Sequence, residues 1–295
     1  MKREEKRKTV RDQDQKYRHI QNKKMITTVY ILLRVSVVLT MIAQIFNGNY
    51  ENVYICVLVL VLFMLPSIIE RKLHIDLPDT LEIIVLLFIY AAEILGEIQE
   101  YYVFIPFWDD LLHTLNGFLF AAIGFSLVNI LNRDRRVTVH LSPFYMAAMA
   151  FCFSMTIGVL WEFFEWGVDS LFHSDMQKDT VVHLLNSVSL NPEGRNIPFH
   201  LKNITDVIVV QADGSQHALG LGGYLDIGLI DTMTDLLVNF IGAVVFSIIG
   251  FFYVKSQGRG KLARHFIPQV MESAPYQPDS LPESPAEEES LGSTE

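Results

Sequence analysis

One stretch of the sequence decides how the rest is interpreted: Trp108-Asp109-Asp110-Leu111-Leu112-His113-Thr114-Leu115-Asn116-Gly117. It begins a long apolar run with two carboxylates, and a histidine follows one helical turn later. Asp109 and His113 are four residues apart, so they share one face if the stretch is helical. Ionisable groups at the end of a lipid-length apolar segment are costly, and they therefore indicate a functional site.

The composition is that of a chain that crosses a membrane. Of its 295 residues, 51% are hydrophobic, and they are concentrated in blocks. The net charge of −10 hides an asymmetry: residues 1–24 hold ten Lys or Arg against four acids, whereas residues 271–295 hold seven acids and no Lys or Arg. We expect a basic head at 1–24 that lies beside the lipid bilayer rather than on a nucleic acid. We expect a disordered tail at 256–295.

Six apolar segments predict membrane-spanning helices, because about 20 residues at about 1.5 Å each cross the hydrocarbon core. The expected spans are residues 25–46, 53–69, 81–98, 111–131, 143–166 and 232–254. The third span is the weakest of the six, since Glu93 and Glu97 interrupt its far end. The fold class is therefore an all-α integral membrane helix bundle, with its membrane domain at 25–255.

The distribution of basic residues predicts the orientation. Lys and Arg crowd residues 1–24, 71–72, 133–136 and 255–264, whereas segments 47–52 and 98–107 have none. The positive-inside rule then places both termini in the cytoplasm, in a multi-pass protein of the cell membrane. The polar segment 169–226 is expected outside, where Ala212-Asp213-Gly214 predicts the turn of a β-hairpin.

Three stripes of ionisable residues are expected at the same outer end of the bundle, each on one helix face. They are Asp109, Asp110 and His113 in the fourth span, Glu162 and Glu165 in the fifth, and Asp231 and Asp235 in the sixth, with Asn239 one turn deeper. Bare carboxylates at close range repel one another. Shared protons would relieve this repulsion, and so would a divalent cation, which a carboxylate set with one imidazole suits.

The cation interpretation assigns a role to each residue. Asp109, His113, Asp231 and Asp235 are the expected metal ligands, with Asp110 and Asn239 in support. Glu162 or Glu165 would then act as a general base on the expected substrate. The alternative is that the aspartates at helix starts simply cap those helices and face water.

Two families share these motifs. Asp109-x-x-x-His113-x-x-Asn116-Gly117, Glu162-x-x-Glu165-Trp166 and Asp231-Thr232-x-x-Asp235, in this order, resemble the motifs of the YjdF-like bacterial inner-membrane proteins. This resemblance covers roughly residues 25–255 and implies a multi-pass topology and the polar site, but no reaction. Asp109-x-x-x-His113 and Asp235-x-x-x-Asn239-x-x-Gly242 are more loosely similar to motifs of VanZ-like membrane proteins, which implies a role in the cell envelope.

Three functions are compatible with the sequence. The first is a metal-assisted hydrolase or transferase that acts on an envelope or lipid-linked substrate. The second is a cation- or proton-coupled transporter. Many transporters are built from internal repeats, and the sequence shows none, which argues against this function. The third is a non-catalytic envelope or scaffold protein whose acids join helix ends. Familiar catalytic signatures such as His-Glu-x-x-His are absent from the sequence.

The orientation can be tested with single cysteines. A cysteine at position 213 should react with a membrane-impermeant thiol reagent in intact cells, because the hairpin is expected outside. A cysteine at position 134, in a basic loop, should react only after the cells are opened. Labelling of position 134 but not of position 213 would reverse the assignment.

Overall fold

The computed structural model describes residues 2–73, 75–133, 141–257, 265–267 and 269–270. Its helices are α1 (Lys2–Asn47), α2 (Tyr50–Leu62), α3 (Leu65–Leu73), α4 (Asp79–Ile89), η1 (Tyr90–Ile98), α5 (Tyr101–Phe104), α6 (Trp108–Arg133), α7 (Pro143–Phe172) and α8 (Leu229–Lys255). Its strands are β1 (Ile75–Asp76), β2 (Val181–Val182), β3 (Leu184–Ser187), β4 (Phe199–Lys202), β5 (Ile208–Val210), β6 (Gln216–Ala218), β7 (Tyr224–Leu225) and β8 (Gln269–Val270).

Five helical segments among the described residues are long and apolar enough to cross a membrane. They are Lys24–Asn47, Tyr50–Lys72, Trp108–Asn132, Pro143–Phe172 and Leu229–Lys255. The shortest has 23 residues, which is about 34 Å of helix and exceeds the hydrocarbon thickness of about 30 Å. The predicted fold class, an all-α membrane helix bundle, is confirmed.

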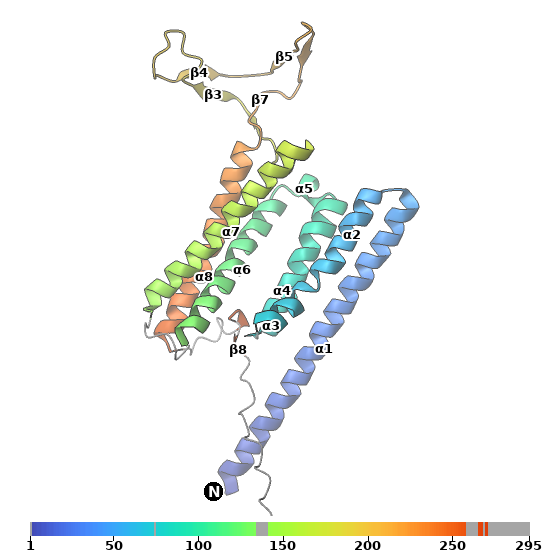
Figure 1. The fold of residues 1–295 in the computed structure, drawn as a ribbon, viewed down its shortest axis with the longest axis vertical. Helices are drawn as coiled ribbons and strands as arrows, with labels where there is room; N and C mark the ends of the chain where they lie inside the picture. Colours follow the sequence, from blue (N-terminus) through green and yellow to red (C-terminus); the bar gives the residue numbers. More distant parts are fainter. Residues whose placement is uncertain (1, 74, 134–140, 258–264, 268, 271–295) are drawn as a thin grey trace, which may run out of the picture.

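The third predicted span, residues 81–98, is helical but is not one of these five segments. It is divided between the α-helix α4 and the π-helix η1, and it carries Glu82, Glu93 and Glu97. Those acids lower its hydropathy, and the π-helix has wider turns than an α-helix. Figure 1 shows α4 and η1 rising beside α2, from the level of α3 to that of α5. Its crossing of the membrane stays a prediction.

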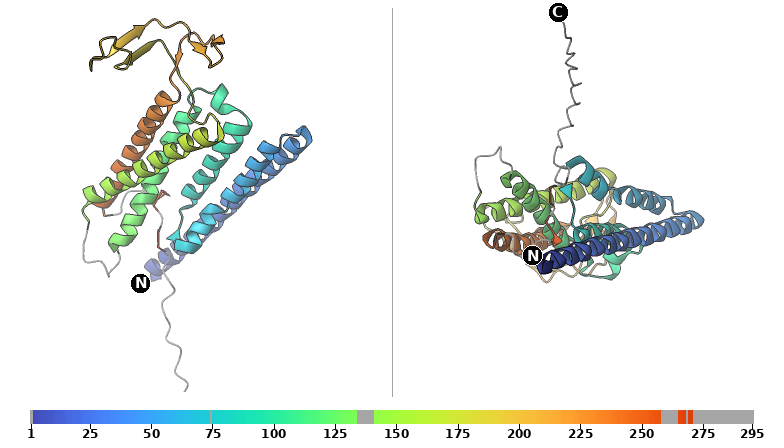
Figure 2. Two further views of the ribbon diagram at one scale, coloured as in Figure 1. Left: turned by 45° about the horizontal axis from the view of Figure 1, so that its top comes forward. Right: turned by 90° about the horizontal axis from the view of Figure 1, so that it is seen from below.

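The helices form two groups, each with its own buried core. Val37, Val59, Phe63 and Leu86 belong to a core that α1, α2, α4 and η1 share. The other core lies among α6, α7 and α8 and includes Phe125, Met146, Ala150 and Phe246. Figure 2 shows α1 and α2 lying apart from α7 and α8. An apolar cavity of about 490 Å³ lies between the groups, lined by Ile84, Leu87, Phe88, Ala91, Trp108, Leu111, Leu112, Thr114, Leu115, Phe118, Gly242 and Val245.

A short segment after α8 ties the two groups together. The Phe266 ring packs edge-on against Phe118 of α6, with centroids 5.0 Å apart, and Ile267 is 2% exposed. Strand β8 pairs antiparallel with β1, which precedes α4. The predicted disordered tail at 256–295 thus contains a short packed segment, because Phe266 and Ile267 find apolar surface to bury. The disorder of the rest of the tail stays a prediction. Residues 271–295 lie outside the described part of the chain.

The segment between α7 and α8 forms three two-stranded antiparallel sheets, β2–β7, β3–β4 and β5–β6. The predicted hairpin is confirmed as β5–β6, and Gly214 in its turn has φ +85°, a conformation that suits glycine. Figure 1 shows these strands beyond the ends of α7 and α8. We call this the strand-bearing end of the bundle.

Two truncations should distinguish the contribution of residues 265–270 to thermal stability from that of residues 272–295. Deletion of residues 272–295 should leave the melting temperature unchanged, because that segment has few apolar residues to bury. Deletion of residues 265–295 should lower it, because the contacts of Phe266 and Ile267 and the β1–β8 pairing are lost. Thermal unfolding in detergent measures both. Equal melting temperatures for the two truncated proteins would show that residues 265–270 contribute nothing to the stability of the fold.

Candidate functional site

Helices α6 and α8 lie so close together that only glycine fits at their contact. Gly117 of α6 packs against the backbone of Asn239, and Gly242 of α8 packs against the backbone of Thr114. A Cβ atom on either glycine would overlap the carbonyl oxygen of the facing helix. Small residues allow this close approach between membrane helices, where packing replaces the hydrophobic effect as the driving force.

Helix α7 joins this contact through polar groups. The Ser154 hydroxyl is buried and donates a hydrogen bond of 2.7 Å to the Gly117 carbonyl oxygen. Gly158 leaves room for the Asn239 side chain, whose Nδ2 would lie 2.6 Å from a Cβ at that position. Asn239 is 1% exposed, and its Nδ2 contacts the Met155 sulfur at 3.6 Å. These contacts fix α6, α7 and α8 relative to one another within about two turns of the acids.

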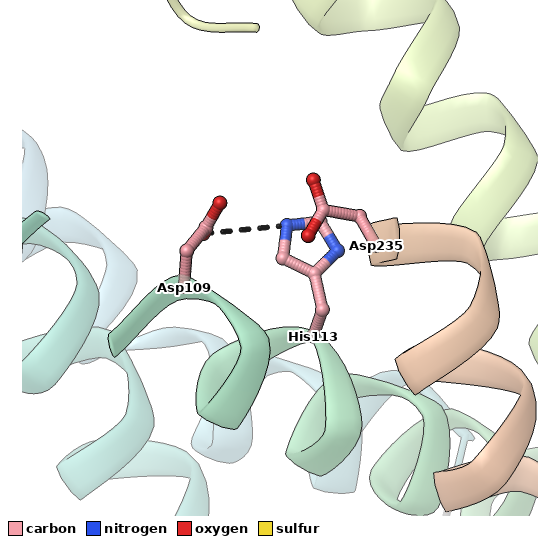
Figure 3. A group of neighbouring side chains, drawn as sticks. All are labelled: Asp109, His113 and Asp235. Atoms are coloured by element: carbon pink, nitrogen blue, oxygen red, sulfur yellow. Dashed lines mark ion pairs between the residues drawn. The ribbon is translucent and has the colours of Figure 1, made fainter. Parts of the chain in front are cut away.

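The first group of neighbouring ligand atoms comes from α6 and α8. Asp109, His113 and Asp235 each offer one atom, and these atoms all lie within 4.8 Å of one another. The His113 Nε2 atom is 3.6 Å from Asp109 Oδ1. Figure 3 shows Asp109 and His113 rising from one helix, with the Asp235 carboxylate reaching the imidazole from α8. His113 and Asp235 are buried, whereas the Asp109 side chain is 31% exposed.

The second group shares Asp235 with the first. Glu162 and Glu165 of α7 and Asp235 of α8 offer atoms that also lie within 4.8 Å of one another. All three residues are buried. The other imidazole nitrogen of His113, Nδ1, is 3.8 Å from Glu162 Oε1, so the two groups are contiguous. The Trp161 indole N–H donates a hydrogen bond of 2.8 Å to Glu165 Oε1 and orients that carboxylate.

The buried carboxylates are poorly compensated within the described part of the chain. Both oxygens of Glu162 and Oδ2 of Asp235 are buried without a hydrogen-bond partner. The Thr232 hydroxyl faces Glu162 without meeting the geometry of a hydrogen bond. Among the described residues, no Lys or Arg forms an ion pair with a carboxylate of either group. Because unpaired buried polar groups are costly, these oxygens require a partner.

Asp110, Asp231 and Asn239, which the sequence also indicated, lie outside both groups. The backbone carbonyl of Asp110 accepts a hydrogen bond of 2.7 Å from the Thr114 hydroxyl. Asp231 Oδ2 accepts one of 2.7 Å from the backbone N–H of Lys178. The structure thus gives Asp231 a contact with the loop before β2, and Asn239 a contact with α7.

That loop is held by Asp169, a residue that sequence reasoning missed. Its carboxylate accepts hydrogen bonds from the backbone N–H groups of Met176, at 2.7 Å, and Gln177, at 2.8 Å. The Gln177 side chain in turn donates to the Thr232 hydroxyl at 2.5 Å. Residues 174–178 are therefore fixed against the first turn of α8, beside the two groups. A lone aspartate at a helix end carries no signal for this contact in the sequence.

The comparisons place the chain in a family of membrane proteins. The family described as "Predicted membrane protein (DUF2238)" matches residues 28–256, which include both groups, and the chain belongs to it. An uncharacterized protein of Thermotoga maritima is 26% identical over 106 residues, which cover 36% of this chain and 53% of that protein. The chain thus spans about half the length of this relative. No solved structure matches the chain. The YjdF-like and VanZ-like resemblances stay predictions.

The glycine contact between α6 and α8 can be tested by adding one methyl group. Gly117→Ala should lower the free energy of unfolding by about 1–3 kcal/mol, because the backbone of Asn239 leaves no space for it. Gly167→Ala in α7 is the control, since nothing lies within 4 Å of its Cβ, and it should be neutral or stabilising by up to about 1 kcal/mol. Denaturant or thermal unfolding in detergent measures both. Equal stabilities for the two variants would contradict the close approach.

Proposed function

We propose that this membrane protein binds a divalent cation at its strand-bearing end, which faces the outside of the cell membrane. We further propose that it uses the cation for hydrolysis or group transfer on a lipid-linked or envelope substrate. The observation that carries the proposal is the group of Asp109, His113 and Asp235, whose ligand atoms lie within 4.8 Å of one another on two tightly packed helices.

The ligand types support a cation more than shared protons. Two carboxylate oxygens with one imidazole nitrogen form a donor set that Zn²⁺, Mn²⁺ and Fe²⁺ accept. Shared protons would neutralise the carboxylates in pairs, but they would give the His113 imidazole no role, whereas a cation uses its nitrogen and a buried oxygen of Asp235 together. A helix bundle is also a known place for carboxylate and histidine ligands that project inward from facing helices.

The surroundings of the site support a substrate that is anchored in the membrane. Trp161 and Trp166 are exposed on α7, next to Glu162 and Glu165 in the sequence. Exposed tryptophans of membrane helices settle at the level of the lipid headgroups. A site at this depth is reached by a headgroup or by a lipid-linked polar group without the substrate leaving the bilayer.

The chemistry follows from the donor set. A bound cation would supply an activated water and would stabilise negative charge on a phosphoryl or carbonyl oxygen. Asp109, His113 and Asp235 would hold it, and the partly exposed Asp109 side chain leaves a way in for substrate. Glu162 and Glu165 face the same space, where the sequence assigns one of them the role of general base.

The cavity between the helix groups argues for binding over transport. It is lined by apolar side chains and Thr114, so a cation would find almost no ligands inside this cavity. Reconstitution into vesicles separates these functions, because a transporter moves the cation across the bilayer and an enzyme does not.

Replacement of Glu165 tests the cation. Glu165→Gln should lower the Mn²⁺ content of purified protein that has been stripped and reloaded. It should also narrow the difference in melting temperature between chelated and Mn²⁺-loaded protein, because a ligand stabilises the folded state only as far as it binds. Glu51→Gln, at the exposed start of α2, is the control and should leave both quantities unchanged. If Glu165→Gln instead stabilises the protein at neutral pH and Mn²⁺ has no effect, the acids share protons.

The reaction is tested on the same preparations. Mn²⁺-loaded protein in vesicles of total polar lipid from a bacterial inner membrane should change the mass of a lipid or lipid-linked species. Chelated protein should leave the lipids unchanged. Bound Mn²⁺ without any altered lipid species would support the proposed cation site but would contradict an enzymatic reaction on these lipids.

A further inference from the structure

We infer that the site holds two divalent cations, with Asp235 as the ligand that bridges them. The inference rests on the proposed function and extends it from one cation to a pair. It arises from the way the two groups of ligand atoms overlap: Asp235 of α8 is common to both, whereas α6 supplies the other ligands of one and α7 those of the other.

The geometry suits one cation in each group. Metal–ligand bonds of about 2.0–2.2 Å place the ligands of one cation roughly 3–4.4 Å apart, and the atoms of each group lie within 4.8 Å of one another, so shifts of about half an ångström bring them into range. A carboxylate has two oxygens and can give one to each cation. Two-metal sites hold their ions about 3.5–4 Å apart, which is the separation that a bridging carboxylate spans.

The buried oxygens are an independent observation that points to the second cation. Glu162 is 4% exposed, and neither of its oxygens has a hydrogen-bond partner. Asp235 is 2% exposed, and its Oδ2 has none either. One cation held by Asp109, His113 and Asp235 would satisfy an oxygen of Asp235 but would leave Glu162 without a partner. A second cation in the group of Glu162, Glu165 and Asp235 would give a partner to Glu162 and to the other oxygen of Asp235.

The charges of the four carboxylates in the two groups can be balanced by a pair of cations. Asp109, Glu162, Glu165 and Asp235 carry four negative charges when ionised, and within the described ranges no Lys or Arg pairs with them. One divalent cation would leave two negative charges in a mostly buried space, whereas two cations would balance all four. Lys178 is the basic side chain of the adjacent loop, and its Nζ lies 3.9 Å from Asp175 instead.

The two positions differ in chemistry. The position between α6 and α8 has a nitrogen ligand and suits Zn²⁺, Mn²⁺ or Fe²⁺, whereas the position between α7 and α8 has only carboxylate oxygens and suits Mg²⁺ or Mn²⁺. Mn²⁺ fits both. The pair makes Glu162 and Glu165 ligands, and the general base is then unnecessary, because a water between two cations is already deprotonated more easily.

The experiment counts bound Mn²⁺. Full-length protein in detergent is stripped with a chelator, titrated with Mn²⁺, freed of excess and measured by elemental analysis and electron paramagnetic resonance. We expect two Mn²⁺ per chain and the spectrum of a magnetically coupled pair. His113→Ala and Glu162→Gln should each retain one Mn²⁺ and lose the coupling, and Asp235→Asn should weaken both positions. Glu51→Gln should retain the coupled pair.

Each outcome has a separate meaning. One Mn²⁺ per chain in the unaltered protein, with no coupling, would overturn the bridge and leave the proposed cation site in place. No bound Mn²⁺ would overturn both. Two Mn²⁺ per chain in Glu162→Gln, at unchanged affinity, would show that Glu162 is not a ligand and would restore its role as a base. Near-ultraviolet circular dichroism of each variant establishes that it is folded, and the count in the unaltered protein does not depend on any variant.

Discussion

The site depends on a contact in which two helix backbones touch without side chains between them. Gly117 and Gly242 face the backbones of Asn239 and Thr114, and both glycines are needed because the contact is made from both sides. His113 precedes Gly117 by one turn, and Asp235 precedes Gly242 by two turns, so the contact sets how far the imidazole lies from the carboxylate. Helices separated by ordinary side chains would hold these groups several ångströms farther apart.

Burial of the acids follows from the same packing. Helix α7 packs against α6 and α8 through Ser154 and Gly158, and it brings Glu162 and Glu165 close to Asp235. The bundle thus holds carboxylates from three helices at close range. Such an arrangement costs free energy unless something binds between the oxygens.

The sequence predicted where the helices lie along the chain far better than it predicted how they pack against one another. Apolar runs, basic loops and turn residues locate α1, α2, α6, α7 and α8, because lipid requires long apolar helices whatever their partners are. The division of residues 81–98 into α4 and η1 was not predicted, since a π-helix has no clear signature of its own. Helical spacing did identify Asp109 with His113, and Glu162 with Glu165, as pairs on one face. It could not tell that Asp235, rather than Asp231, lies between those pairs, because that depends on the rotation of α8 about its axis.

The pairing of β1 with β8 constrains the order in which the molecule is assembled. Strand β1 follows α3, near the start of the membrane domain, whereas β8 comes after α8. During synthesis from the amino end, every membrane helix must therefore leave the ribosome before this ladder can form. The two helix groups can each bury their own core earlier, because the residues of each core lie within one part of the chain, apart from Phe266 and Ile267. This ladder therefore forms only after α8 has left the ribosome, so a chain that stops after α8 can bury both cores but lacks the β1–β8 connection between the helix groups.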